Sequence, residues 1–177
     1  EERRASFPNL LIVDRPKRFY PAGPAIGHII GYVSEINDDE LKLPAYAEAG
    51  YEQGRWIGKA GVEKQYELQL SGEDGARFVE VDAKGRIVNP RSIVGVQPPD
   101  PGEDLRLTLD LKLQEYIAEI FPDTMKGAVV AMVPSTGEIL AMYSNPSYDP
   151  NDFVGGISNP LWSALQNDPL KPLIDRA

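Results

Sequence analysis

The sequence predicts an α+β fold in two parts, divided by a proline-rich segment. Residues 97–103 read Gln-Pro-Pro-Asp-Pro-Gly-Glu, and three prolines with one glycine can continue neither a helix nor a central strand. Short helical and strand-like patterns are mixed before this segment, whereas a clearer strand, helix and hairpin pattern follows it. We therefore expect one domain over residues 1–97, and a linker with a second domain over residues 98–177.

The composition excludes several classes of function. The 177 residues carry 27 acidic and 18 basic side chains, a formal net charge of −9, one histidine and no cysteine. Without cysteine the chain forms neither a disulfide scaffold nor a thiolate metal site. Its acidity gives no charge-based reason to bind nucleic acid. No stretch reaches the roughly 18 consecutive apolar residues that a membrane helix needs.

The patterns in the first domain are short. Residues 10–15 and 18–20 are expected to be extended, and residues 25–31 to form a short apolar helix or turn. Asn37-Asp38-Asp39-Glu40 is typical of a helix start, with Glu40 available for a capping box.

A longer helix and a hairpin are predicted next. Residues 61–70 predict an amphipathic helix with Val62, Tyr66 and Gln69/Leu70 on one face, and Gly72 is placed to cap its C-terminus. Two β-rich runs, residues 78–81 and 86–88, flank the loop Asp82-Ala83-Lys84-Gly85 and predict a β-hairpin.

The second domain has stronger patterns. Residues 104–109 alternate polar and apolar and predict a half-buried strand. Asp110 can then cap a helix ending at Phe121, with a buried face made of Leu113, Ile117, Ile120 and Phe121. Residues 127–133 predict a strand buried on both faces, and the turn at residues 134–137 leads into a second strand over residues 138–143. The remaining residues are rich in loops, with short helical pieces such as residues 161–166.

No complete catalytic constellation is present. No serine is followed three residues later by lysine, and neither Lys-Thr-Gly nor Gly-x-Ser-x-Gly occurs. Gly58-Lys59-Ala60-Gly61 lacks the Ser/Thr of a phosphate-binding loop.

Asp149 and Asp152 could form a carboxylate pair, but acids beside Pro150 and Asn151 are more typical of a turn. His28 lies between apolar residues and, without a second histidine or a cysteine, indicates a core or interface position rather than a metal ligand. The residues alone therefore favour a scaffold or interaction role, with no catalytic residue, metal or cofactor.

Several motifs carry a resemblance to a known family. Arg18-Phe19-Tyr20-Pro21-Ala22-Gly23 resembles an Arg-x-Tyr-Pro-x-Gly box, and the run from Gly58 through Gly61, Glu63 and Tyr66 to Gly72 and Gly75 resembles a Gly-x-x-Gly-x-Glu box. Both boxes are typical of class B penicillin-binding proteins. Residues 80–88, which include Gly85 and Arg86, resemble the hairpin that follows, and residues 107–114, 134–151 and 165–177 resemble the entry into the transpeptidase domain. The sequence Gly-Tyr-Val-Ser-Glu-Ile-Asn at residues 31–37 and the Asn-Asp-Pro at residues 167–169 resemble the elongation branch, penicillin-binding protein 2.

This resemblance implies a fold, a role and a location. The fold is a small pedestal (dimerisation-type) domain, incomplete at its N-terminus, followed by the first part of a penicillin-binding transpeptidase fold that stops before Ser-x-x-Lys. The family cross-links peptidoglycan during cell-wall elongation and maintains cell shape, through a serine acyl-enzyme formed on D-Ala-D-Ala stem peptides. The implied location is the periplasmic face of the inner membrane, with the anchor absent from these residues. The implied partners are the membrane glycan polymerase and a scaffold protein of the elongasome, while peptidoglycan and β-lactams would bind the catalytic part.

Two questions remain open at the level of the sequence. Arg18 and Glu63, the charged members of the two boxes, are expected to pair across the domain, because a partly buried charge needs a partner; exposed surface charges are the alternative. The chain is expected to be a portion of a longer transpeptidase, since it opens with Glu-Glu-Arg-Arg and no methionine. The alternative is a stand-alone interaction module of the cell-wall machinery that is not an enzyme.

Overall fold

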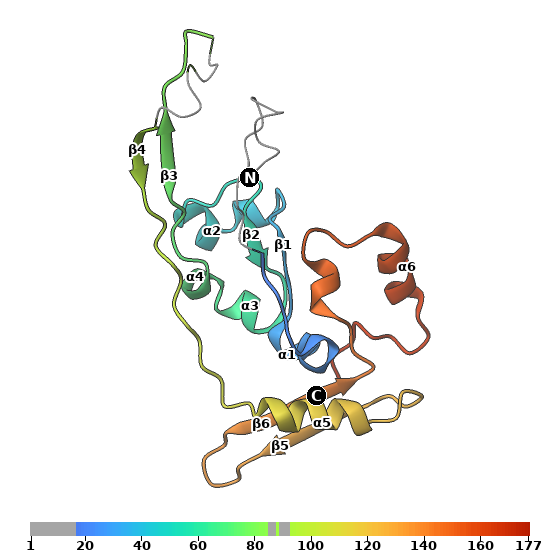
Figure 1. Cartoon of the computed structure of the whole chain (residues 1–177). Coiled ribbons are helices and arrows are strands. Elements are labelled where there is room, and N and C mark those ends of the chain that lie inside the picture. The colour runs from blue at the N-terminus through green and yellow to red at the C-terminus, as the bar shows by residue number, and fades with distance from the viewer. Residues whose placement is uncertain (1–16, 85–87, 89–92) are drawn as a thin grey trace, which may run out of the picture. The chain divides into compact units, whose positions relative to one another are not determined.

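A computed structural model of the chain describes residues 17–84, 88 and 93–177, as a mixture of short helices and two-stranded antiparallel sheets (Figure 1). This confirms the predicted α+β class. The chain divides into two compact units, one containing Gly72–Gly102 and the other containing Arg18–Ser71 together with Glu103–Ala177. In the described residues no helix combines the length and the apolar character needed to cross a membrane. The division between domains at residues 97/98 stays a prediction, because the compact units join segments that are distant in sequence.

The unit containing Gly72–Gly102 is built on one β-ribbon. Strand β3 (Ala76–Val79) pairs antiparallel with β4 (Ile93–Gln97), and the ribbon closes where Glu73 and Asp100 exchange backbone hydrogen bonds of 2.8 and 3.0 Å. Phe78 and Val79, which the prediction places in the first strand of a hairpin with residues 86–88, pair with Gly95 and Ile93 of β4. Within the predicted hairpin, the Val88 amide donates to the Glu80 carbonyl at 3.0 Å, while Arg86 and Ile87 lie outside the described residues.

The first half of the other unit contains eight short elements. They are η2 (Gly23–Ile26), α1 (Gly27–Ile30), β1 (Val33–Glu35), η3 (Glu40–Lys42), α2 (Pro44–Glu48), β2 (Trp56–Gly58), α3 (Gly61–Gln65) and α4 (Glu67–Leu70). Strands β1 and β2 pair antiparallel with Ser34 opposite Ile57, and Ile57 is 1% exposed. It packs with Ile36, Tyr46 and Tyr51 in a small core. The expected extended segment at residues 10–15 lies outside the described residues.

The predicted capping box is present at the start of η3. The Asn37 amide donates to the Glu40 carboxylate at 2.9 Å, and the Glu40 amide donates to Asn37 Oδ1 at 2.9 Å. Two orphan amides at the helix start are thus satisfied reciprocally. Glu40 also forms an ion pair with Lys59, which ties this capped turn to the residues just before α3.

The helix predicted over residues 61–70 is divided, and the predicted face with Val62, Tyr66 and Gln69/Leu70 is not the most buried one. The backbone leaves helical geometry at Tyr66, which separates α3 from α4, and the Tyr66 side chain is 37% exposed. The residues that are buried are Glu63 and Glu67, each 5% exposed. The helix face toward the interior is therefore defined by two carboxylates whose partners come from elsewhere in the chain. Gly72 takes a positive φ of 59° after α4, as the predicted helix cap requires.

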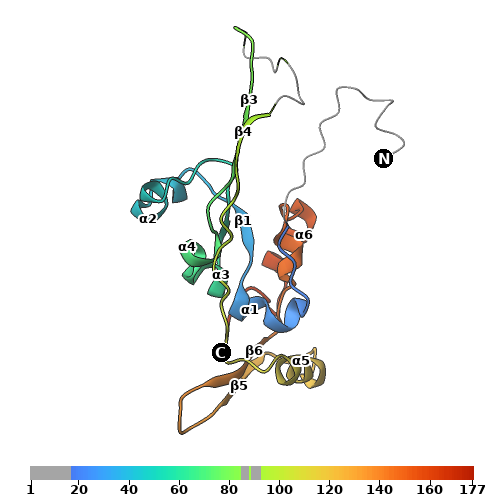
Figure 2. The same cartoon turned by 60° about the vertical axis from the view of Figure 1, so that its left-hand side comes forward.

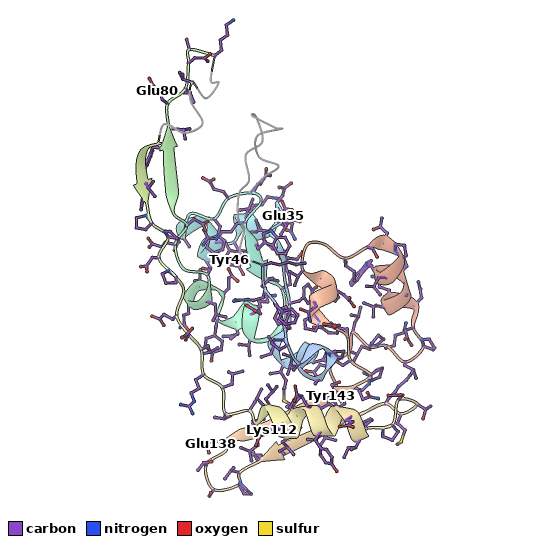
Figure 3. The ribbon with its side chains drawn as sticks, in the orientation of Figure 1. Glu35, Tyr46, Glu80, Lys112, Glu138 and Tyr143 are labelled. Atoms are coloured by element: carbon purple, nitrogen blue, oxygen red, sulfur yellow. The ribbon has the colours of Figure 1, made fainter. Side chains whose placement is uncertain are left out.

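The second half of this unit is a helix on a hairpin. Helix α5 (Leu111–Ile120) is capped by the Asp110 carboxylate, which accepts from the Lys112 and Leu113 amides as predicted. Strand β5 (Gly127–Met132) pairs with β6 (Ile139–Asn145), and Ile117 of α5 packs on Ala141 and Tyr143. Figures 1 and 2 show α5 lying along the hairpin, and Figure 3 marks Tyr143 beside α5 and Glu138 near the hairpin turn. Two further helices follow, η4 (Pro150–Phe153) and α6 (Asn159–Asn167).

Three predictions about this half are wrong. Residues 104–109 form no strand, although the Thr108 hydroxyl donates to the Ile139 carbonyl of β6 at 2.7 Å. Ile120 is 57% exposed, and Gln114 instead takes a fully buried place on α5. Strand β5 is buried on one face only, since Val130 and Met132 are exposed on the face opposite the α5 core.

Candidate functional site

Glu63 is the centre of a buried carboxylate site that joins the two sequence boxes. The Arg18 guanidinium contacts it through two bonds, Nε to Oε1 at 2.8 Å and Nη2 to Oε2 at 2.9 Å. The Tyr20 hydroxyl donates to the same carboxylate at 3.1 Å, and Tyr20 is buried. The Arg18 side chain remains 43% exposed, so the fork closes the site from the solvent side. The expected Arg18–Glu63 pair is confirmed, and the alternative of two exposed charges is wrong.

Glu67 forms the second half of the site, one helical turn further along. Its Oε1 accepts from the Tyr51 hydroxyl at 3.0 Å and its Oε2 from the Gly58 amide at 2.7 Å. Tyr51 and Ser71 also share a hydroxyl–hydroxyl bond of 2.8 Å. Neutral donors thus hold Glu67, whereas Glu63 has a cation. Sequence patterns do not single out Glu67 or Tyr51; the only signal is the spacing of Glu63 and Glu67, which places both carboxylates on one side of a helical turn.

Burial controls the protonation of the two tyrosines. Burial, and then the charge and hydrogen bond of Glu63, raise the pKa of Tyr20. Burial is also the main cause that raises the pKa of Tyr51; the Ser71 bond opposes it and the Glu67 charge adds to it. Both phenols therefore stay protonated near neutral pH and remain hydrogen-bond donors to the carboxylates.

Glycines allow the backbone to approach the site closely. A Cβ at Gly58 would lie 2.2 Å from the carbonyl atoms of Glu63, and a Cβ at Gly61 would lie 2.3 Å from the Ile29 carbonyl oxygen. Gly31 is the reciprocal partner, since a Cβ there would lie 2.0 Å from the Ala60 carbonyl oxygen. The glycines of the Gly-x-x-Gly-x-Glu box thus dock α3 on both α1 and β2, and they fix where Glu63 lies.

The Arg-x-Tyr-Pro-x-Gly box also contacts the second half of the chain. Asn151 Oδ1 accepts from the Tyr20 amide at 3.0 Å, and Asn151 Nδ2 donates to the Tyr20 carbonyl at 2.9 Å. Asp149 caps η4 through the Asn151 amide and lies 3.4 Å from the Cβ position of Gly23, whose φ is 48°. Asp149 therefore has the turn role that the sequence favours over a carboxylate pair. Asp152 follows within η4, and burial raises its pKa, with the Asp149 charge second.

Aromatic rings extend this contact. Tyr32 stacks on Phe153 with ring centroids 4.0 Å apart, and Phe153 also meets Tyr148 and Trp162 edge to face. His28 lies edge-on to Tyr148 at 5.1 Å. Residues 28–32 and residues 148–162 are thus joined by one chain of ring contacts.

Gln114 makes a third contact between the halves. Its amide nitrogen donates to the Ala25 carbonyl at 2.6 Å and the Met142 carbonyl at 2.9 Å, and its oxygen accepts from the Met142 amide at 2.9 Å. A buried glutamine with three backbone partners could not be recognised from an amphipathic pattern, which assigns such positions to apolar residues.

The other motif residues are not brought to the carboxylate site as side chains. Pro21 and Tyr66 are exposed, and Gly72 and Gly75 belong to the other compact unit, where a Cβ at Gly75 would lie 2.7 Å from the Gln97 carbonyl oxygen. Gly85 and Arg86 lie outside the described residues.

The arrangement is suited to holding chain segments together. Within the described residues there is no group of three His, Cys, Asp or Glu side chains that could hold a metal ion. The carboxylates face donors from their own chain at hydrogen-bond distance, so the site joins the segment at residues 18–20, strand β2 and helices α3 and α4.

Two family models match this chain. A model of the penicillin-binding protein dimerisation domain matches residues 1–107, and a model of the penicillin-binding protein transpeptidase domain matches residues 127–173. The chain belongs to the penicillin-binding protein family. The carboxylate site lies within the dimerisation-domain match, and the Asn151, aromatic and Gln114 contacts connect that match to the residues that follow it.

Curated relatives and solved structures agree with this family. The chain is 46% identical to peptidoglycan D,D-transpeptidase MrdA of Escherichia coli strain K12 over 97% of its length, and 39% identical to penicillin-binding protein 3 of Bacillus subtilis over 88%. Among structures, PBP2 of Helicobacter pylori in complex with MreC matches with a TM-score of 0.72, 36% identity and 90% coverage of this chain. Pseudomonas aeruginosa PBP2 in complex with WCK 5153 matches with a TM-score of 0.63, 34% identity and 92% coverage.

The matched region is a limited part of each relative. It covers 27% of the E. coli protein, 22% of the B. subtilis protein, and 29% and 30% of the two solved chains. The chain therefore spans about a quarter of the length of the curated relatives that it matches. The expected family and the expected combination of a dimerisation domain with the beginning of a transpeptidase domain are confirmed.

Proposed function

We propose that this chain is the non-catalytic pedestal portion of an elongation-type penicillin-binding protein, a peptidoglycan D,D-transpeptidase that acts in cell-wall elongation and cell shape. One observation carries the proposal: segments from the dimerisation-domain match and from the second half pack into one compact unit, through Asn151 on Tyr20 and Gln114 on Ala25. A pedestal that forms these contacts with the first helix and hairpin of a transpeptidase domain would hold that domain in a defined orientation. Glu63 and Glu67 stabilise the pedestal segment that makes these contacts.

In this proposal the chemistry belongs to the longer protein. A serine attacks the D-Ala-D-Ala end of a stem peptide, forms an acyl-enzyme and passes the acyl group to a neighbouring amine, while a lysine activates the serine. No serine in the 177 residues has a lysine three positions later. The role of this chain is therefore support, and it needs no cofactor of its own.

The proposed partners are proteins of the elongation machinery. The structural similarity to H. pylori PBP2 in its complex with MreC supports a scaffold partner of that kind. A membrane glycan polymerase is the second proposed partner, on the family resemblance. Peptidoglycan and β-lactams would bind the catalytic part. The proposed location is the periplasmic face of the inner membrane.

A chimera tests the proposal directly. The matching segment of E. coli MrdA is replaced by this chain in cells depleted of their own MrdA, and cell shape and labelling by a fluorescent penicillin are recorded. We expect rod-shaped growth and a labelled chimera, because the chain is 46% identical to the segment that it replaces. Round cells with a stable but unlabelled chimera would contradict the pedestal role.

The purified chain supplies the complementary measurement. We expect no labelling of the chain itself by the same penicillin, since it lacks Ser-x-x-Lys. A labelled band at its own mass, about 19.5 kDa, would overturn the non-catalytic assignment.

The alternative is a stand-alone interaction module of the cell-wall machinery. The exposed apolar face of β5 argues against it, because Val130 and Met132 would remain in water in an isolated module. The intact mass of the protein in its native cells separates the two, since a module has the mass of this chain and a transpeptidase is several times larger.

A further inference from the structure

The chain has a single histidine, and it lies where the two halves of one compact unit meet. His28 belongs to α1, which also contacts β6. The His28 and Tyr148 rings are nearly perpendicular with centroids 5.1 Å apart, and His28 Nε2 lies 3.5 Å from the Pro146 carbonyl oxygen. One residue earlier, a Cβ at Gly27 would lie 2.4 Å from the Tyr148 carbonyl oxygen, so the backbones of α1 and the 146–148 loop are in close contact. The histidine is therefore part of a tight junction.

The charged and titratable groups around His28 come from several elements. Asp175 and Arg176 of the C-terminal segment act on it electrostatically with opposite signs, and Tyr148 faces it from the loop. Strand β6 carries Tyr143, and α3, which packs on α1, carries Lys64 and Glu63, whose charge is engaged by Arg18. The charges of Asp175 and Arg176 oppose each other, so burial is the main influence on whether the His28 imidazole is neutral or cationic.

We propose that the charge on His28 controls how tightly α1 holds the loop at residues 146–148, so that the junction between the two halves loosens in acid. A cationic imidazole would lie beside Tyr148 in a half-buried position, where desolvation disfavours the charged form. This inference rests on the proposed periplasmic location, where the junction would be exposed to the pH outside the cytoplasm.

The direction of the pH effect follows from linkage. Burial lowers the pKa of His28 below its ordinary value of 6.5, although carbonyl contacts with Pro146 and Pro172 and the charge of Asp175 oppose this shift. The unfolded or undocked chain therefore binds a proton more readily than the docked chain. The stabilising contribution is fully present above pH 6.5 and is lost as the pH falls through the pKa of the docked state.

Because the chain has one histidine, its titration can be followed without assignment. The imidazole Cε1–H signal of the purified chain is recorded by NMR between about pH 5 and pH 8. We expect a midpoint below 6.5, shifted further down in Asp175→Asn, which removes a charge that favours the cation. A midpoint at or above the ordinary value would overturn the proposal.

Amide hydrogen exchange tests the junction itself and needs no transpeptidase activity. After correction for intrinsic exchange, we expect protection of residues 27–30 and residues 144–148 to fall together in the wild-type chain as the pH falls from 7.5 to about 5.5, with a thermal midpoint lowered by about 2–4 °C. In His28→Gln this pH dependence should disappear, because the amide does not titrate. Equal pH dependence in the two proteins, or loss of protection confined to other segments, would contradict the proposal whatever the outcome of the chimera experiment.

Discussion

At the scale of single residues, two buried carboxylates one helical turn apart are satisfied in different ways. Glu63 has a bidentate cation and a phenol, whereas phenol and backbone amide donors hold Glu67. A buried carboxylate is tolerated only when its oxygens accept hydrogen bonds, and removing one partner leaves the desolvation cost in place. Arg18, Tyr20 and Tyr51 therefore have a structural role, because each supplies a hydrogen bond that a buried carboxylate needs.

Replacing Arg18 by alanine should lower the free energy of unfolding by about 1–3 kcal/mol, because Glu63 keeps its charge but loses its cation. The lower end allows for the solvent screening of the Arg18 side chain, which is 43% exposed. Arg18→Lys should recover only part of the loss, since an ammonium cannot form the two-bond fork. Urea unfolding of the purified chain measures both variants, and an unchanged midpoint in Arg18→Ala would mean that the pair adds nothing.

The sequence predicts one of these carboxylate contacts and not the other. The Arg18–Glu63 pair could be inferred because each residue is the charged member of a recognisable box. The contacts of Glu67 with Tyr51 and Gly58 depend on how β2 lies beside α4, and no local pattern in residues 51–67 encodes that placement. For the same reason, the pattern at residues 61–70 predicts an apolar inner face where the structure buries Glu63 and Glu67.

At the scale of elements, the short helices are stabilised by close backbone contacts with each other, because they are too short to be stable on their own. Helices α1 and α3 have four and five residues, too few to be stable alone in water. They are docked on each other through Gly31 and Gly61, where any side chain would meet backbone atoms. The docking, and not helix propensity, sets their position.

Two glycines with positive φ, of which only one is closely packed, test this docking. Gly61 has a φ of 56° and a Cβ position 2.3 Å from the Ile29 carbonyl oxygen, whereas Gly54 has a φ of 86° and no atom within 4 Å of its Cβ position. We expect Gly54→Ala to cost about 1 kcal/mol from the left-handed backbone alone, and Gly61→Ala about 2–4 kcal/mol because the clash adds to it. Thermal unfolding of the two variants isolates the clash, and equal losses would show that α1 can move aside without cost.

Elements whose signals are local could be predicted, and those that depend on distant partners could not. The Asp110 cap of α5, the Asn37–Glu40 capping box and the turn between β5 and β6 are all encoded within a few residues. The strand expected at residues 104–109 has the correct alternation but finds no ladder partner in the described residues. Strand β3 likewise has its ladder partner in β4, a run that no local pattern predicted as a strand.

At the scale of the whole molecule, sequence order and spatial grouping differ. The unit containing Arg18–Ser71 is completed by Glu103–Ala177, so residues 18–71 and 103–177 should fold and unfold together. The family models divide the same residues between a dimerisation domain and a transpeptidase domain. The junction of these two segments is therefore internal to one compact unit.

Gln114 offers a test of that cooperativity. Replacing it by leucine leaves the Ala25 carbonyl and both backbone groups of Met142 without their partner, so we expect faster amide exchange both at residues 25–30 and at residues 139–145. Glu115→Ala, on the exposed side of α5, is the matched control and should leave both segments protected. Loss of protection confined to the hairpin would show that the two halves unfold separately.

The buried tyrosines set an alkaline limit on the fold. Burial is the largest cause that raises the pKa of six of the described phenols, to about 12 for Tyr148, and the others are Tyr20, Tyr32, Tyr46, Tyr51 and Tyr143. Unfolded tyrosines ionise near pH 10, so this contribution to stability is complete below that pH and is lost above it. Absorbance at about 295 nm should therefore show these phenols ionising together with the loss of secondary structure, as a single cooperative step. Burial, and then the charge and hydrogen bond of Glu63, raise the pKa of Tyr20, so we expect Tyr20 to lose its proton in strong base only as the carboxylate site opens.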